Sequence, residues 1–283
     1  MMTDWFRPAR PLDAALTAEP RFSVASDSLF FDGHFPGRPI VPGIALLGMV
    51  RETARRSLAG VPLPLAFRRV RFRALIEGEA TLVTRLTATT AAAGTEGSPA
   101  GPAADAPAAG FPFEVRWGDQ LAADGLLVQA PCGAVKLPPF GPDAVEESRS
   151  IEDFLPHRGR MRVAASILRV QPGLCEVEAE ALPSWPLAFA TGADSVVLLE
   201  LLAQTAAAMT GWEERHTPGG GGRGFLVGSR FFTSSSAEVP FGTLCRSTVH
   251  SLRHRDNYRV FQGLVSAPDG TLLAEGELQA FRA

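Results

Sequence analysis

The chain has 283 residues, 46% of them apolar, which is enough to build the core of one large domain or two small ones. Its net charge of −3 gives no indication of bulk nucleic-acid binding. The three cysteines, Cys132, Cys175 and Cys245, follow no paired spacing, so we expect a reducing cytoplasm and no disulfide framework.

The first half of the sequence is predicted to hold one long helix among several strands. The helix covers residues 44–58, which are apolar early and basic late, as the C-terminal end of a helix prefers. Alternating and β-branched stretches predict strands at 21–31, 65–76, 80–90, 111–117 and 120–129.

Residues 91–110 interrupt this pattern with a low-complexity run. The run contains only Ala, Gly, Pro, Ser, Thr, Asp and Glu. Such a composition cannot bury enough apolar surface to order itself. We therefore predict a disordered insertion inside the first unit, which would span residues 1–130.

A proline-rich linker is predicted at 131–150, and the same order of elements then restarts over 151–283. A helical turn is expected at 151–156 and a long helix at 193–214. Strands are predicted at 162–171, 174–182, 225–234, 244–252, 258–265 and 271–281. The sequence thus predicts an α+β chain of two similar units. Its most apolar stretch, 195–209, is too short to span a bilayer.

One stretch stands out for its chemistry: residues 33–43 read GHFPGRPIVPG. Its Pro-Gly pairs predict a rigid turn that ends where the first helix begins. His34 and the bare backbone amides at Pro42-Gly43 would then lie together at the positive end of a helix dipole. A base beside amides that can stabilise a carbonyl oxygen suits acyl chemistry, although a histidine alone in such a turn is more often an ordinary loop residue.

This stretch resembles the active-site loop of the FabA/FabZ-type 3-hydroxyacyl-ACP dehydratases, where HFPGxPxxPG precedes the central helix of a hot-dog fold. Every fixed letter of that motif is present between His34 and Gly43. The resemblance implies that His34 is the catalytic base and that the Gly43 amide binds the thioester oxygen. It also places Gly37 and Gln204 with Gly43 among the oxyanion- and substrate-binding residues.

The second half carries its own resemblance to this family. Residues 155–158 read LPHR, residues 200–204 match the ExxAQ element of the central helix, and residues 224–228 read GFLVG. This half looks like the second dehydratase subunit of aryl-polyene pathways, and the first half looks like its partner subunit. The implied architecture is a tandem, or double, hot-dog fold in which antiparallel sheets each wrap around one long central helix. In the family, the LPHR element, here with His157, packs the fold rather than reacting.

Each half lacks one member of the catalytic pair. In FabZ-type enzymes the acid follows the histidine by 14 residues, but the residue 14 positions after His34 is Gly48. The residue 14 positions before Glu200 is Pro186. Family active sites lie between two hot dogs, so we expect His34 and Glu200 to form one composite site and the Gly48/Pro186 site to be dead. Apolar neighbours should raise the pKa of Glu200, and Gln204, one turn later, can hydrogen-bond its carboxyl group.

The resemblance implies dehydration of a 3-hydroxyacyl chain carried by an acyl carrier protein to the trans-2-enoyl product, without cofactor or metal. Alternatives on the same fold are a thioesterase, a CoA-linked hydratase and a non-catalytic scaffold subunit. Arg69, Arg71 and Arg73, which alternate with Val70 and Phe72 along a predicted strand, either form a solvated strand face or dock the acidic carrier protein. His250 and His254 are not aligned for a metal on a strand.

Overall fold

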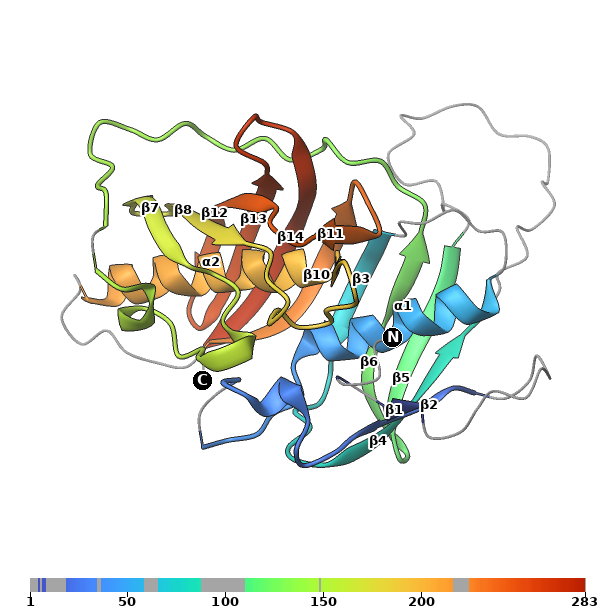
Figure 1. Cartoon of the computed structure of the whole chain (residues 1–283). Coiled ribbons are helices and arrows are strands. Elements are labelled where there is room, and N and C mark those ends of the chain that lie inside the picture. The colour runs from blue at the N-terminus through green and yellow to red at the C-terminus, as the bar shows by residue number, and fades with distance from the viewer. Residues whose placement is uncertain are drawn as a thin grey trace.

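The computed structural model describes residues 5, 7–8, 19–34, 37–58, 66–87, 110–147, 149–215 and 224–282. Within this part of the chain, a 12-stranded sheet passes behind two long helices (Figure 1). The predicted insertion at 91–110 lies outside the described residues, except that Gly110 begins a strand.

The N-terminal half places helix α1, Gly43–Ser57, against an antiparallel set of strands. Ten of its 15 residues are buried, which reflects its apolar composition. In sheet order, the strands are β1 (Arg7–Pro8), β2 (Arg21–Val24), β4 (Ala80–Leu86), β5 (Gly110–Trp117), β6 (Gln120–Val128) and β3 (Ala66–Phe72).

The C-terminal half repeats this plan around helix α2, Val197–Arg215. Two short 3-10 helices precede its sheet, η3 (Ile151–Asp153) and η4 (Gly159–Met161). In sheet order, the strands are β10 (Gly224–Ser234), β14 (Leu272–Arg282), β13 (Tyr258–Ser266), β12 (Leu244–Arg255), β8 (Leu174–Glu180) and β7 (Ser166–Gln171). A separate two-stranded sheet pairs β9 (Gly192–Asp194) with β11 (Glu238–Pro240).

The two halves join edge to edge through one antiparallel pair, β3 with β10. The register sets Val70 opposite Ser229 and Phe67 opposite Phe232, and all four of these residues are buried. This pairing removes an exposed edge from each half. The chain is therefore a pseudo-dimer within one polypeptide, with the helix-and-sheet repeat that the sequence predicts.

Several element boundaries differ from the prediction, two of them because short polar side chains redirect the backbone. The expected strand at 21–31 ends at Val24, and residues 29–31 form a 3-10 turn whose Phe30 N–H donates to Ser28 Oγ at 3.4 Å. The second long helix begins at Val197 rather than at residue 193, because Asp194 belongs to β9 and its carboxylate accepts from Val196 N–H at 3.0 Å.

One buried carboxylate anchors the start of the segment between the halves through hydrogen bonds. The backbone amides of Gly133, Ala134 and Val135 donate to Glu275 of β14 at 2.7–2.9 Å. From there the chain runs past the sheet to the side of the C-terminal half where β7 lies (Figure 1). The unit boundaries at 130 and 150 stay a prediction. Among the described residues, no helix is long and apolar enough to cross a membrane.

Candidate active site

A cavity of about 280 Å³ opens between the two halves. The N-terminal half contributes His34, Gly43 and Phe72 to its wall, and the C-terminal half contributes His157 and Glu200. Titratable groups from both halves therefore meet in one largely apolar space, a common setting for an active site.

His34 is oriented by a short hydrogen bond. Its Nδ1 lies 2.7 Å from the carbonyl oxygen of Ile40, and a carbonyl can only accept, so Nδ1 carries the proton. The lone pair of the neutral ring is then on Nε2. Burial lowers the pKa of His34 to about 4, and the hydrogen bond to Ile40 offsets only part of this effect. At neutral pH the ring is uncharged and able to accept a proton.

Gly43 opens helix α1 at the cavity wall. The N-cap is Pro42, which supplies no side-chain hydrogen bond to the helix. A Cβ at position 43 would lie 2.7 Å from the Phe72 ring, so a larger residue would require that ring to shift. Gly43 lines the cavity, and within the described residues no acceptor is recorded for its N–H, one of the unpaired amides at a helix N-terminus.

Glu200 reaches the same cavity from helix α2 and is only 6% exposed. Burial raises the pKa of its carboxyl group to about 7, as its leucine neighbours predict, while the hydrogen bond from Gln204 acts in the opposite direction. A substantial share of Glu200 is therefore protonated at neutral pH. It can act as a general acid while His34 acts as a base.

Gln204 and Gly37 lie away from the cavity wall. The Gln204 amide donates to Glu200 Oε1 at 2.8 Å and to the carbonyl of Met161, and it accepts from the amides of Val163 and Ala164. Gln204 thus supports the acid from behind. Gly37 is exposed in the turn, with φ +81°, a conformation that favours glycine.

His157 is the site residue that sequence reasoning assigned to packing. It lines the cavity and its Nε2 lies 3.5 Å from Glu200 Oε1. The ring centroids of His157 and His34 are 5.7 Å apart. The tertiary fold brings His157 close to Glu200, and the LPHR motif by itself does not predict this proximity.

The cavity continues along one face of α2 that is made of small residues: Ala203, Ala206, Ala207, Thr210 and Gly211. From Glu200 to Gly211 the helix rises about 16 Å. Small side chains on this face leave room for an extended apolar group beside the helix.

The position equivalent to the site in the other half is filled with protein. A Cβ at Gly48 would lie 3.0 Å from the side chain of Leu187, which follows Pro186 and is fully buried. A side chain at position 48 would therefore require Leu187 to shift. The sequence predicts that this position lacks both the acid and the histidine, and in the structure Leu187 packs against Gly48.

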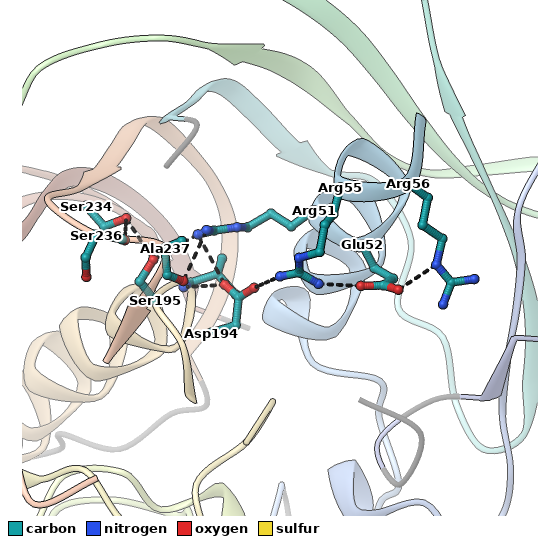
Figure 2. Close-up of polar contacts among 10 residues, drawn as sticks. Arg51, Glu52, Arg55, Arg56, Asp194, Ser195, Ser234, Ser236 and Ala237 are labelled. Atoms are coloured by element: carbon teal, nitrogen blue, oxygen red, sulfur yellow. Dashed lines mark hydrogen bonds and ion pairs between the residues drawn. The ribbon is translucent and has the colours of Figure 1, made fainter. Parts of the chain in front are cut away.

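One turn further along α1, Arg51 forms a buried ion pair with Asp194 of the other half, at 3.1 Å (Figure 2). The two side chains are 1% and 0% exposed. Arg51 also donates to Ser195 Oγ at 2.9 Å and to the carbonyl of Ala237 at 3.2 Å. If Gly48 of α1 is matched to Glu200 of α2, the residue three positions later is Arg51 in α1 and Ala203 in α2. A guanidinium in the N-terminal half thus occupies the position of a small cavity-lining residue in the C-terminal half.

The three predicted docking arginines are exposed on β3 and just after it, while Val70 between them is buried. Arg71 and Arg73 both pair with Asp124 of β6, Arg71 at 2.6 Å. Arg69 lies at a register shift with φ +52°, and no ion pair is recorded for it among the described residues.

Comparison with known proteins gives a consistent picture. Residues 13–95 match the family model for the ApeI-like dehydratases, and residues 149–283 match the model for the ApeP-like dehydratases. No curated protein sequence matches the chain significantly.

Several solved structures are similar over nearly the whole chain. The dehydratase domain from the CurJ module of the curacin polyketide synthase is 14% identical with a TM-score of 0.67, covering 98% of this chain and 96% of that one. The dehydratase domain of RzxB from Pseudomonas fluorescens is 15% identical with a TM-score of 0.66, covering 98% and 97%. The ApeI:P dehydratase heterocomplex from Xenorhabdus doucetiae matches with 18% identity and a TM-score of 0.45, covering 48% of this chain and 93% of that one.

The whole-chain similarities confirm the double hot-dog fold. The two family models divide the chain as the sequence motifs do, with one dehydratase unit on each side of the segment around residues 131–147. The chain therefore carries an ApeI-like dehydratase domain followed by an ApeP-like dehydratase domain in a single polypeptide.

Proposed function

We propose that the chain dehydrates a 3-hydroxyacyl thioester on an acyl carrier protein to the trans-2-enoyl thioester, at one composite site. The observation that carries this proposal is the meeting of His34 and Glu200, from different halves, in one buried cavity. Neither half contains both a base and an acid at the motif positions, so each half needs the other.

The chemistry follows from the two protonation states. His34 Nε2 takes the proton from C2, and the C2–H electron pair forms the C2=C3 bond. The C3–O bond breaks, and Glu200 gives its proton to the departing hydroxyl, which leaves as water. The Gly43 N–H stabilises the negative charge that develops on the thioester oxygen. Transfer of the proton from His34 back to Glu200 restores the starting state.

The acyl chain would extend along the small-residue face of α2, away from the reacting carbons. Alanine and glycine on that face leave the width that an acyl chain needs, and the surrounding wall is mostly apolar. The cytoplasmic location stays a prediction from the sequence.

Carrier-protein docking is tested by replacing Arg69, Arg71 and Arg73 together with alanine. If they attract an acidic carrier protein, turnover of the carrier-bound substrate falls while turnover of a short pantetheine analogue does not. The loss should shrink at high salt. Because Asp124 already neutralises part of the charge on Arg71 and Arg73, we expect a several-fold effect at most. Equal turnover of the carrier-bound substrate would assign these arginines to a solvated face.

The central experiment incubates the chain with a 3-hydroxyacyl carrier protein and follows the loss of one water by intact mass. A thioesterase would instead release the bare carrier thiol, and a scaffold subunit would leave the substrate unchanged. His34→Ala should abolish the reaction, and Glu200→Gln should lower it by about 10²–10⁴-fold, because the amide cannot donate an acidic proton. His254→Ala, at the exposed C-terminal end of β12, is the matched histidine control and should keep full activity.

Mixing the two inactive variants tests where the site is assembled. If the halves of one chain form the site, a mixture of His34→Ala and Glu200→Gln proteins stays inactive. Recovery of activity would show that halves of different chains pair, which contradicts the intrachain site but not the chemistry. Full activity in either single variant would contradict the chemistry itself.

A further inference from the structure

The segment that carries His157 is fixed directly to the segment that carries His34. Arg158 N–H donates to the Gly33 carbonyl at 2.9 Å, and Met161 N–H donates to the Asp32 carbonyl at 3.1 Å. A Cβ at Gly33 would lie only 1.7 Å from the Arg158 carbonyl oxygen. The two halves therefore touch backbone to backbone immediately beside both histidines, which holds the two rings in a set relation.

The segment that carries His157 is also stabilised by hydrogen bonds within itself. Arg158 donates from its guanidinium to the carbonyls of Leu155, His157 and Glu152 at 2.6–3.0 Å. These bonds leave the short loop little freedom, and His157 is only 8% exposed. A histidine that only packed the fold would not need to point at the carboxyl group of an acid in a cavity.

Two side-chain nitrogens lie near one oxygen of that acid. Gln204 Nε2 lies 2.8 Å from Glu200 Oε1, and His157 Nε2 lies 3.5 Å from the same atom. A protonated carboxyl group has one carbonyl oxygen that accepts and one hydroxyl oxygen that donates. Donors gathered at Oε1 favour the carbonyl there, which leaves the acidic proton on Oε2.

We propose that His157 is a positioning residue of the dehydration: together with Gln204 it holds Oε1 of Glu200, so that the proton for the departing hydroxyl stays on Oε2. This inference rests on the proposed function of the site. It requires a neutral imidazole with its proton on Nε2. The charged and titratable groups that face His157 are His34 across the cavity, Arg158 beside it and Glu200.

The electrostatics of the site agree with a neutral donor. Burial lowers the pKa of His157 to about 3, with smaller contributions in the same direction from His34 and Arg158. With the pKa of Glu200 raised to about 7, both partners are uncharged near pH 6. Their contact is thus a neutral donor–acceptor contact rather than an ion pair.

Removing this donor should shift the alkaline limb of the pH–rate profile in a predictable direction. A hydrogen bond to the ionised carboxylate stabilises it more than a bond to the neutral acid does. Loss of the His157 N–H in a cavity that stays dry should therefore raise the pKa of Glu200 and move the alkaline limb of the rate profile to higher pH. If water entered the cavity in the variant, the pKa of Glu200 would fall and the alkaline limb would move to lower pH.

The test compares His157→Phe, which keeps bulk and dryness but has no donor, with His157→Gln, which can present an N–H near the place of Nε2. We expect His157→Phe to lower kcat by roughly tenfold to a hundredfold and to shift the alkaline limb upward. We expect His157→Gln to restore most of both. KM for the carrier-bound substrate should change little in either variant.

The failures of the inference and of the proposed function are distinguishable. If the parent chain does not dehydrate a 3-hydroxyacyl carrier protein, the proposed function fails and so does this inference. If the parent is active but His157→Phe keeps its kcat and its alkaline limb, or His157→Gln is as impaired as His157→Phe, only the positioning role is overturned. Thermal unfolding checks that each variant folds. Should His157→Phe not fold, the smaller His157→Leu makes the same comparison.

Discussion

Replacing Arg51 with methionine tests the buried ion pair that ties the two halves together. The guanidinium lies between the halves with 1% exposure, paired with Asp194 and hydrogen-bonded to Ser195 and Ala237 (Figure 2). Methionine keeps a similar length without charge. Asp194 would then remain buried with only Val196 N–H at 3.0 Å and the half-exposed Arg55 at 3.4 Å.

The expected cost follows from leaving one charge of a buried pair uncompensated. Breaking such a pair from one side costs about 3–5 kcal/mol of unfolding free energy. Replacing both partners with apolar residues is often close to neutral. The double variant Arg51→Met, Asp194→Leu should therefore be less destabilised than the single one. It should still lose about 1 kcal/mol, because the Asp194 carboxylate also caps the start of α2.

Urea unfolding of the full chain measures these differences, with Arg56→Met as the matched control. Arg56 lies five residues later on α1, is exposed, and among the described residues its recorded ion pair is with Glu52 of the same helix, a pair worth about 0.3–0.5 kcal/mol. A cost for Arg51→Met as small as that of Arg56→Met would refute the reasoning. So would a double variant that loses the sum of the two single costs, because independent sites add and coupled ones do not.

Three further predictions follow from the site and the sequence. The kcat/KM profile should be flat between about pH 4 and pH 7, falling below as His34 gains a proton and above as Glu200 loses one; Glu200→Gln should lose the upper limb. Ala207→Phe should fill the space beside α2 and lower kcat/KM for long acyl substrates at least tenfold, while 3-hydroxybutyryl substrates should be nearly unaffected. Replacing residues 94–109 with a short Gly-Asn turn should preserve folding and activity, since loop length costs only ~0.6 kcal/mol per doubling; an inactive or insoluble variant would contradict this.

The hydrophobic periodicity of the sequence predicted the order of helices and strands, because each element has a local pattern of apolar and polar residues. Helix α1 was expected at 44–58 and covers Gly43–Ser57, and strand β5 was expected at 111–117 and covers Gly110–Trp117. The segments that failed are those where one side chain overrules propensity. Ser28 turns the backbone of a predicted strand, and Asp194 holds apart a strand and a helix that apolar composition alone would merge.

The sequence predicted the candidate site residues that belong to motifs. It could not predict residues whose role depends only on tertiary contacts. The absence of an acid at Gly48 and of a histidine at Pro186 was enough to suggest that His34 and Glu200 belong together. No spacing in the sequence shows that His157 approaches Glu200, because the loop between η3 and η4 is placed by its contact with residues 32–33. Similarly, nothing in the basic end of α1 distinguishes the buried Arg51 from its exposed neighbours.

Leu187 fills the space beside Gly48, so the proposed absence of a second site there need not reduce stability. A cavity at Gly48 would cost the free energy of unfilled apolar space, whereas Leu187 packs against the glycine and is fully buried. Leu187 adopts φ +58°, an unfavourable conformation for a branched side chain, and the Asp194 N–H to Leu187 carbonyl bond of 3.0 Å helps to hold it there. Asp194 thus serves both the packing of Leu187 and the ion pair with Arg51. Introducing a histidine at 186 and a glutamate at 48 would require Leu187 to shift, and Leu187 is hydrogen-bonded to Asp194, which pairs with Arg51, so we expect such a variant to weaken the junction between the halves as well.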